Sequence, residues 1–187
     1  MKKITLKIIS FCTSLLNPGL LNSTYKNLSR ITIFKKSIYR IVKFIIPEKV
    51  RLDNYELFLN QKDAMVSGSI ALNVYENFEI EILIEKLEAH MTVIDIGANI
   101  GYYTLLAASR VEKVLAFEPD TTNFKLLEKN VAVNNCNNVT CYQLAIADKE
   151  GSVTLYENPE NFGDRRIYSF EDAGEKVEVK AVASTRF

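Results

Sequence analysis

The 187-residue chain has few of the residue types that build metal centres and disulfide frameworks. It contains no tryptophan, one histidine and three cysteines. Cys12, Cys136 and Cys141 show no Cys-x-x-Cys pairing, and His90 is too isolated to complete a zinc ligand set. We therefore expect no metal site and no disulfide scaffold. Unpaired cysteines are typical of a reducing compartment, which favours the cytoplasm.

Acidic residues are absent from the first 47 positions, although the whole chain balances 23 acidic against 23 basic side chains. The cations of this segment are Lys2, Lys3, Lys7, Lys26, Arg30, Lys35, Lys36, Arg40 and Lys43. Isoleucines alternate with the cations between Ile31 and Ile46, as in an amphipathic helix with a basic face. We expect residues 1–49 to form a basic helical arm, either touching an anionic membrane surface peripherally or lying on the domain as a solvated helix.

Long apolar runs are also missing. A transmembrane helix needs about 20 consecutive apolar residues, and the sequence offers no such run. The first residues, MKKITLKIISFCTSLL, superficially resemble a secretion signal, but Lys7 interrupts the apolar segment and no small-x-small cleavage site follows. We expect neither a membrane span nor a secretory leader.

The remaining residues show the pattern of an α/β domain. Apolar residues at helical spacing predict a helix from Glu76 to Leu87, and YYTLLAASR predicts another after Gly101. Buried strands are expected at Thr92–Ile96, 113–117 and 139–146, with a helix between the last two for which Thr121 and Thr122 offer the N-cap. Period-two alternation in SVTLYE and VEVKAVA predicts two further strands. Alternating strands and helices indicate a Rossmann-like parallel sheet, preceded by the helical arm.

The turn after the first of these strands is the strongest indication of a binding site. The segment VIDIGANIG places Gly97 and Gly101 four residues apart, directly after a strand that contains Asp95. The dinucleotide fingerprint G-x-G-x-x-G fails at Asn99 and Tyr102, and no Gly-Lys-Ser/Thr follows to make a phosphate loop. The pattern acidic-x-Gly-x-Gly-x-Gly, which wraps the amino acid part of S-adenosylmethionine, matches at all but Asn99, a residue that adopts left-handed backbone more readily than most.

Glu118 ends the second strand, about 20 residues beyond the glycine turn, where a carboxylate can accept hydrogen bonds from both ribose hydroxyls. Enzymes that use NAD have the same device, so Glu118 does not choose between the two cofactors. The glycine pattern favours S-adenosyl-L-methionine. The competing interpretation is an ordinary turn with Asp95 and Glu118 acting as helix caps.

Five separated blocks in the chain resemble the FkbM-type methyltransferases, which are class I enzymes that use S-adenosylmethionine. The blocks are VIDIGANIGYYT, VLAFEPD, LLEKNVAVNN, NVTCYQLAIADKEGSVTLY and NFGDRRIYS. The resemblance covers roughly residues 50–182 and implies an O-methyltransferase that acts on a sugar or secondary-metabolite hydroxyl, with no nucleic acid partner.

The resemblance also implies roles for individual residues. It places the methyl donor against Asp95, Gly97, Ala98, Asn99 and Gly101, and its ribose on Glu118. Ala145 and Asp148, at the end of the third strand, are expected near the adenine, although Asp148 could equally form a turn before Gly151. Asp164 is a candidate for substrate contact, and Arg165 and Arg166 could hold an anionic acceptor, although a solvated charged loop is the competing interpretation. No catalytic base is assigned, because His90 precedes the first strand and lies at the wrong end for the site.

The sequence departs from the family pattern at its end. Family members continue into a fourth core strand that carries an acidic turn beside the transferred methyl group, whereas this sequence stops at Ser-Thr-Arg-Phe. We therefore expect residues 50–187 to form only the cofactor-binding half of a methyltransferase, C-terminally truncated. Two hypotheses follow: a methyltransferase, active or inactive as this fragment, and a non-catalytic module that keeps the fold and uses the arm to bind a partner or membrane.

Overall fold

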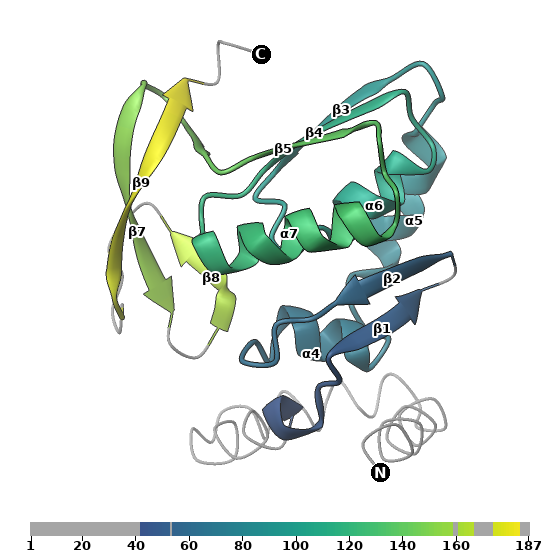
Figure 1. Cartoon of the computed structure of the whole chain (residues 1–187), viewed down its shortest axis with the longest axis horizontal. Coiled ribbons are helices and arrows are strands. Elements are labelled where there is room, and N and C mark those ends of the chain that lie inside the picture. The colour runs from purple at the N-terminus through teal and green to yellow at the C-terminus, as the bar shows by residue number, and fades with distance from the viewer. Residues whose placement is uncertain (1–41, 53, 159–160, 167–173, 184–187) are drawn as a thin grey trace.

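The computed structural model describes residues 42–52, 54–158, 161–166 and 174–183 (Figure 1). Most of the predicted basic arm lies outside these residues. Of that segment, residues 42–45 are helical, and the Ile46 side chain is completely buried in a core cluster with Leu57 and Ile70. The last residues of the predicted arm therefore pack into the domain. None of the described helices is long and apolar enough to cross a membrane.

A three-stranded parallel sheet forms the centre of the molecule. Its strands, in spatial order, are β3 (Thr92–Ile96), β4 (Lys113–Phe117) and β5 (Val139–Tyr142). Helix α6 (Tyr102–Ala108) connects β3 to β4, and α7 (Thr121–Val133) connects β4 to β5. The alternation of strands and helices that was read from the sequence is confirmed, and the bounds of β3 and β4 agree with the predicted ones.

Both connecting helices pack on the same face of this sheet. Val114 and Ala116 of β4 point to that face and are completely buried, in clusters that contain Ala107 of α6 and Leu127 of α7. The opposite face carries every second residue of each strand. Ile94 and Ile96 of β3 belong to it and remain 42% and 62% exposed, so no described element covers this part of the sheet.

A hairpin and two helices precede the central sheet. They are β1 (Lys49–Leu52), β2 (Tyr55–Phe58), α4 (Val66–Ala71) and α5 (Asn77–Lys86). Figure 1 shows the hairpin on the side of α7 that faces away from the sheet. Of these elements only α5 was predicted from the sequence.

Two asparagines of α7 hold the hairpin by its backbone. The Asn130 amide accepts from the Phe58 N–H at 2.7 Å and donates to the Phe58 carbonyl at 3.0 Å. One turn later, Asn134 makes the same pair of bonds with Glu56, at 2.9 and 2.7 Å. Asn130 also donates to the Ile100 carbonyl at 2.7 Å, so one buried side chain connects the hairpin, α7 and the glycine turn.

Two sequence predictions about element ends are wrong. The third strand was expected to run to Ile146, but β5 ends at Tyr142, and β6 (Ala145–Ala147) pairs with a different sheet. The apolar residues on either side of Gln143 do not reveal where the chain changes sheets, because both segments have the composition of strands. The N-cap of α7 is Asp120, whose carboxylate accepts from the Asn123 N–H at 2.8 Å, rather than either threonine.

The second sheet has the order β6-β9-β7-β8. It contains the predicted strands β7 (Gly151–Asn158) and β9 (Lys176–Ala183), together with β8 (Asn161–Arg166), which was not predicted as a strand. β7 pairs antiparallel with β8 and β9, whereas β6 and β9 run parallel. This sheet stands beside the parallel sheet in Figure 1 and does not extend it.

Candidate functional site

In the turn between β3 and α6, every second residue has a left-handed backbone conformation. The φ angles of Gly97, Asn99 and Gly101 are 78°, 51° and 92°. The N–H groups of Gly97 and Ala98 both donate to the Phe117 carbonyl, at 2.9 and 3.0 Å, so the turn is fastened to the end of β4. Asn99 therefore does what the missing glycine of the sequence pattern would do, as predicted from its tolerance of this conformation.

The two glycines serve different purposes. A Cβ atom added at Gly101 would lie 2.8 Å from Cδ1 of Leu127, so glycine is needed there to let α7 approach the turn. A Cβ added at Gly97 would meet no atom within 4 Å. Gly97 therefore borders open space at the carboxyl end of the sheet, where ligands of open α/β sheets bind.

The Glu118 carboxylate is buried and held by backbone groups. Its Oε2 accepts from the Asn99 N–H at 2.8 Å, and its Oε1 accepts from the Asp120 N–H at 2.9 Å. Each carboxylate oxygen has two lone-pair directions, so a carboxylate can accept hydrogen bonds from more than one donor. The acidic side chain at this position is thus fixed in orientation next to the glycine turn.

Asp95 lies one strand away, on the face of the sheet that α6 covers. Its Oδ2 accepts from the Thr104 hydroxyl at 2.5 Å. Burial raises the pKa of the Asp95 carboxyl above its ordinary range, and the bonds from Thr104 oppose this rise only in part. A largely buried carboxylate with no cation paired to it among the described residues is an energetically costly arrangement, which a positively charged ligand group would relieve.

A cluster of two tyrosines and one glutamate borders the same region and was missed by sequence reasoning. The Tyr103 hydroxyl donates to Oε2 of Glu76 at 2.5 Å, and the Tyr75 and Tyr103 rings lie 6.4 Å apart. Burial raises the pKa of the Tyr75 phenol, and the charges of Glu76 and Asp95 add to the rise. Glu76 itself has a left-handed backbone, with φ of 40°. No residue spacing could have revealed this cluster, because the fold brings α5 and α6 together.

The other predicted residues belong to elements outside the glycine turn and β4. Ala145 is buried in β6, at the start of a new strand and not at the end of the third strand, and Asp148 is exposed beyond the end of β6. Asp164 and Arg165 belong to β8, whose side chains lie outside the described part of the structure. His90 is 77% exposed before β3, 3.6 Å from a Glu88 oxygen, so it is remote from the glycine turn.

Two observations test whether the turn fits S-adenosylmethionine. The space at Gly97 leaves room for a ligand against the backbone, and the buried Asn99 Oδ1 has no hydrogen-bond partner among the described residues. The donor set also suits the molecule, because Asp95 can attract an ammonium group and Glu118 can accept from hydroxyls. The residues present fit this cofactor. The described residues contain no cluster of three His, Cys, Asp or Glu side chains that could hold a metal ion.

Comparison with known proteins agrees with this geometry. Residues 95–186 match the model of the methyltransferase FkbM domain. Over these residues the chain belongs to the FkbM methyltransferase family. The match begins at Asp95 and so contains the glycine turn and Glu118. The resemblance noted from the sequence began about 45 residues earlier, at the hairpin, which lies outside the matched FkbM domain.

One curated relative is Methyltransferase 1 of Beauveria bassiana, 28% identical over 79 residues that cover 41% of this chain and 32% of the relative. The FkbM methyltransferase structure from Methylobacillus flagellatus is 14% identical with a TM-score of 0.31, covering 64% of this chain and 34% of that one. Trm5b from Pyrococcus abyssi is 21% identical with a TM-score of 0.42, covering 54% and 33%. The chain thus spans about a third of the length of each of these proteins.

Proposed function

We propose that this chain binds S-adenosyl-L-methionine at the glycine turn and, as a methyltransferase, transfers its methyl group to a hydroxyl of a sugar or secondary metabolite. The open space at Gly97 beside the backbone-held carboxylate of Glu118 carries this proposal. The family match supports the reaction class, and the acceptor rests on the family resemblance alone.

Each residue of the turn would have a separate task. Asp95 would attract the ammonium group, and the backbone of Gly97, Ala98 and Asn99 would lie against the amino acid part of the cofactor. Gly101 acts indirectly, because its missing side chain lets Leu127 and α7 support the turn.

Glu118 would accept hydrogen bonds from the ribose hydroxyls. The two backbone N–H groups that hold its carboxylate make this orientation available before the ligand arrives, which reduces the entropy that binding costs. Ala145 and Asp148 would lie toward the adenine, on the segment that leads from β5 into the second sheet.

When bound, the cofactor supplies an electrophilic methyl group on a sulfonium, which an acceptor oxygen displaces in line. The contribution of the chain to such a displacement is positioning and the exclusion of water. A hydroxyl acceptor must also lose its proton, and we assign no general base to this chain. Asp164 and Arg165 of β8 would hold the acceptor, with the arginine suited to an anionic group.

The test is transfer of a labelled methyl group from S-adenosylmethionine to a panel of sugars, with RNA as a separate arm. We expect label on a hydroxyl-bearing small molecule and none on RNA. The matched pair Gly97→Val and Gly151→Val serves as control, because both glycines have positive φ and open surroundings but only Gly97 borders the site. Label that appears equally with Gly97→Val would contradict the proposal. Cofactor binding without any transfer would favour the non-catalytic module.

A further inference from the structure

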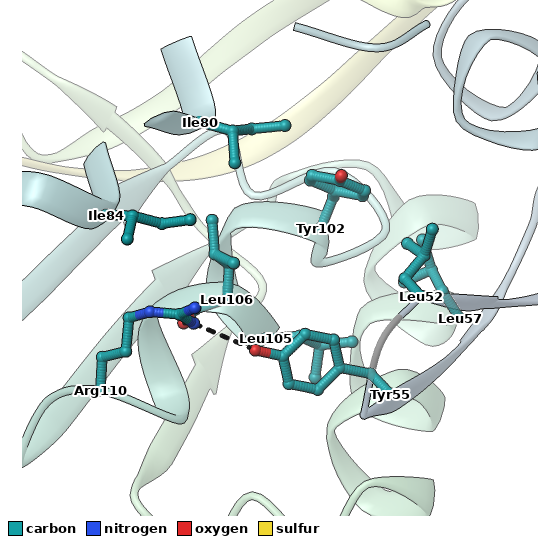
Figure 2. Close-up of a pocket in the computed structure, with 9 residues that line it drawn as sticks. All are labelled: Leu52, Tyr55, Leu57, Ile80, Ile84, Tyr102, Leu105, Leu106 and Arg110. Carbon is teal, nitrogen blue, oxygen red and sulfur yellow. Dashed lines mark hydrogen bonds between the residues drawn. The ribbon is translucent and has the colours of Figure 1, made fainter. Parts of the chain in front are cut away.

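A second pocket lies on the far side of α6 from the central sheet. Thr104 and Ala107 of α6 face the sheet, whereas the residues at spacing i, i+3, i+4 and i+8 line the pocket: Tyr102, Leu105, Leu106 and Arg110. The hairpin residues Leu52, Tyr55 and Leu57 form the opposite wall, and Ile80 and Ile84 of α5 complete it (Figure 2). The pocket is therefore separate from the glycine turn, although both use α6.

The walls of this pocket are apolar. Its floor is fully buried, since Leu57 is 0% exposed and Leu105 is 2% exposed, but Ile84 at its edge is 36% exposed. Apolar surface that lines a concave opening gains free energy when a ligand removes it from water. The cavity measures about 100 Å³, below the roughly 300 Å³ at which sites for drug-sized molecules begin. It can take one short hydrocarbon chain but no nucleotide and no two-chain lipid.

A single cation marks one end of the pocket. Arg110 donates through Nη1 to the Tyr55 hydroxyl at 3.2 Å, to Ser109 Oγ at 2.8 Å and to the Leu106 carbonyl at 3.0 Å. Tyr55 and Ser109 are themselves hydrogen-bonded at 2.9 Å, so the arginine is held at a defined place. Figure 2 shows its guanidinium beside the Tyr55 hydroxyl, at the end of the pocket that lies away from Tyr102.

The guanidinium keeps unused binding capacity. All its hydrogen bonds run through Nη1 to neutral oxygens, and the ion pairs among the described residues do not include it. Its Nε and Nη2 groups therefore retain donors in the planar arrangement that matches two oxygens of a carboxylate. A cap for the end of α6 would need only the bond to Leu106, so capping does not explain an arginine placed at an apolar opening.

We infer that this pocket binds a single-chain aliphatic monocarboxylate, with its carboxylate on Arg110 and its chain against the partly exposed walls formed by Leu52, Ile80 and Ile84. A neutral hydrocarbon would leave the arginine without an anion, and a short carboxylate such as acetate would leave these three side chains in water. The ligand class follows from the combination of a single unpaired cation with a narrow apolar cavity. This inference does not depend on the proposed methyl transfer.

The experiment is an NMR titration of the whole chain with octanoate at neutral pH, with the methyl groups of isoleucine and leucine labelled. We expect shifts at the methyl groups that line the pocket, from Ile80, Ile84, Leu52, Leu57, Leu105 and Leu106. Ile94 and Ile96 on the uncovered sheet face serve as internal controls and should not shift. Hexanoate should bind about tenfold more weakly, because two buried methylene groups are lost.

Three variants distinguish specific recognition of octanoate from non-specific hydrophobic binding. Arg110→Gln should weaken octanoate at least about fivefold while leaving octan-1-ol within about twofold, because only the charged head group loses its partner. Ile84→Glu, at an edge that is 36% exposed, should also abolish octanoate binding by placing a like charge at the opening. Arg51→Gln, an exposed arginine outside the pocket, should change neither ligand.

The inference is overturned if octanoate shifts Ile94 and Ile96 as strongly as the pocket residues, or if Arg110→Gln binds octanoate as tightly as the parent chain. Absence of any shift up to about 10 mM octanoate, which corresponds to less than roughly 3 kcal/mol of binding free energy, overturns it equally.

Discussion

The Asn99 N–H donates to Oε2 of Glu118 at 2.8 Å, which joins the glycine turn after β3 to the residue that ends β4. Glu118 also accepts from the Asp120 N–H, directly before α7. One carboxylate thus connects three segments: the glycine turn, the end of β4, and the short connection from β4 to α7. The same side chain that would bind a ribose is part of the local fold.

This double role predicts a stability cost for Glu118→Ala. Removing the carboxylate leaves two backbone N–H groups without their acceptor, and each such loss in a buried place costs about 1–3 kcal/mol. We expect the free energy of unfolding to fall by roughly 2–4 kcal/mol in urea denaturation. Glu112→Ala, at an exposed position, should stay within about 0.5 kcal/mol of the parent. Equal stability of the two variants would show that the bonds from Asn99 and Asp120 contribute little.

Gly97→Ala tests the open space of the turn. The added methyl group meets no protein atom, so loss of ligand affinity beyond that of a control must come from contact with the ligand. Gly151→Ala is the matched control, since it too has positive φ and open surroundings. Backbone strain of about 1–2 kcal/mol should lower the melting temperature of both. Only Gly97→Ala should weaken S-adenosylhomocysteine, at least tenfold by calorimetry; equal affinities would place the ligand elsewhere.

Gly101→Ala should act on the fold. Its Cβ would meet Leu127 Cδ1 at 2.8 Å, and its φ of 92° is strained for any L residue. Summing about 1–2 kcal/mol of strain with about 1–3 kcal/mol of overpacking gives an expected loss of roughly 2–5 kcal/mol. The double variant with Leu127→Ala should recover part of the overpacking term relative to the sum of the single changes. Purely additive losses would mean that the two side chains do not meet.

Asp95→Asn should separate stability from binding. Burial raises the pKa of Asp95 in the folded chain, so the native state holds its proton to higher pH than the unfolded state does. Stability is therefore lost as pH rises from the ordinary carboxyl range, about 3.9, through the raised pKa. We expect Asp95→Asn to melt above the parent at pH 7, with a difference that shrinks toward pH 4.

The same variant should bind S-adenosylhomocysteine about tenfold more weakly, because the neutral amide no longer attracts the ammonium group. Glu112→Gln, at an exposed position outside the site, controls for the loss of one charge. A melting difference that does not change with pH would contradict the account of Asp95.

The uncovered face of β3 predicts poor solution behaviour. Ile94 and Ile96 expose apolar surface on a strand that is paired on one side only among the described residues, and such edges favour aggregation. Ile96→Thr should raise the soluble yield without lowering the melting temperature by more than a few degrees. If Ile96→Thr leaves the yield unchanged, the exposed isoleucines do not limit solubility.

The sequence was sufficient for the elements that turn residues delimit on both sides. β3 and β4 are short strands of a parallel sheet, and turn residues mark both ends of their apolar runs. The β1–β2 hairpin was missed, because its four-residue strands alternate charged and apolar residues and are held by Asn130 and Asn134, more than 70 positions later. Side-chain bonds across such a separation leave no local pattern.

The candidate site divides in the same way. The spacing of Gly97, Gly101 and Glu118 could be recognised in the sequence, because one helix and one strand separate the glycine turn from the end of β4. The roles of the two glycines were not, because the contact of Gly101 with Leu127 belongs to helix packing. The pocket with Arg110 could not be predicted from the sequence either, since the hydrogen bond between Arg110 and Tyr55 of the hairpin joins residues that are far apart in the chain.

Calorimetry with S-adenosylhomocysteine tests the central claim most directly, on the parent chain, Glu118→Gln and Glu112→Gln. Glu118→Gln keeps one acceptor oxygen but loses the charge and the second acceptor, at a cost of about 1.5–3 kcal/mol. We predict measurable binding by the parent chain and by Glu112→Gln, and an affinity for Glu118→Gln that is roughly ten- to a hundredfold weaker. Absence of binding to the folded parent chain, or equal affinity of all three proteins, would contradict the assignment of the glycine turn and Glu118 as the cofactor site.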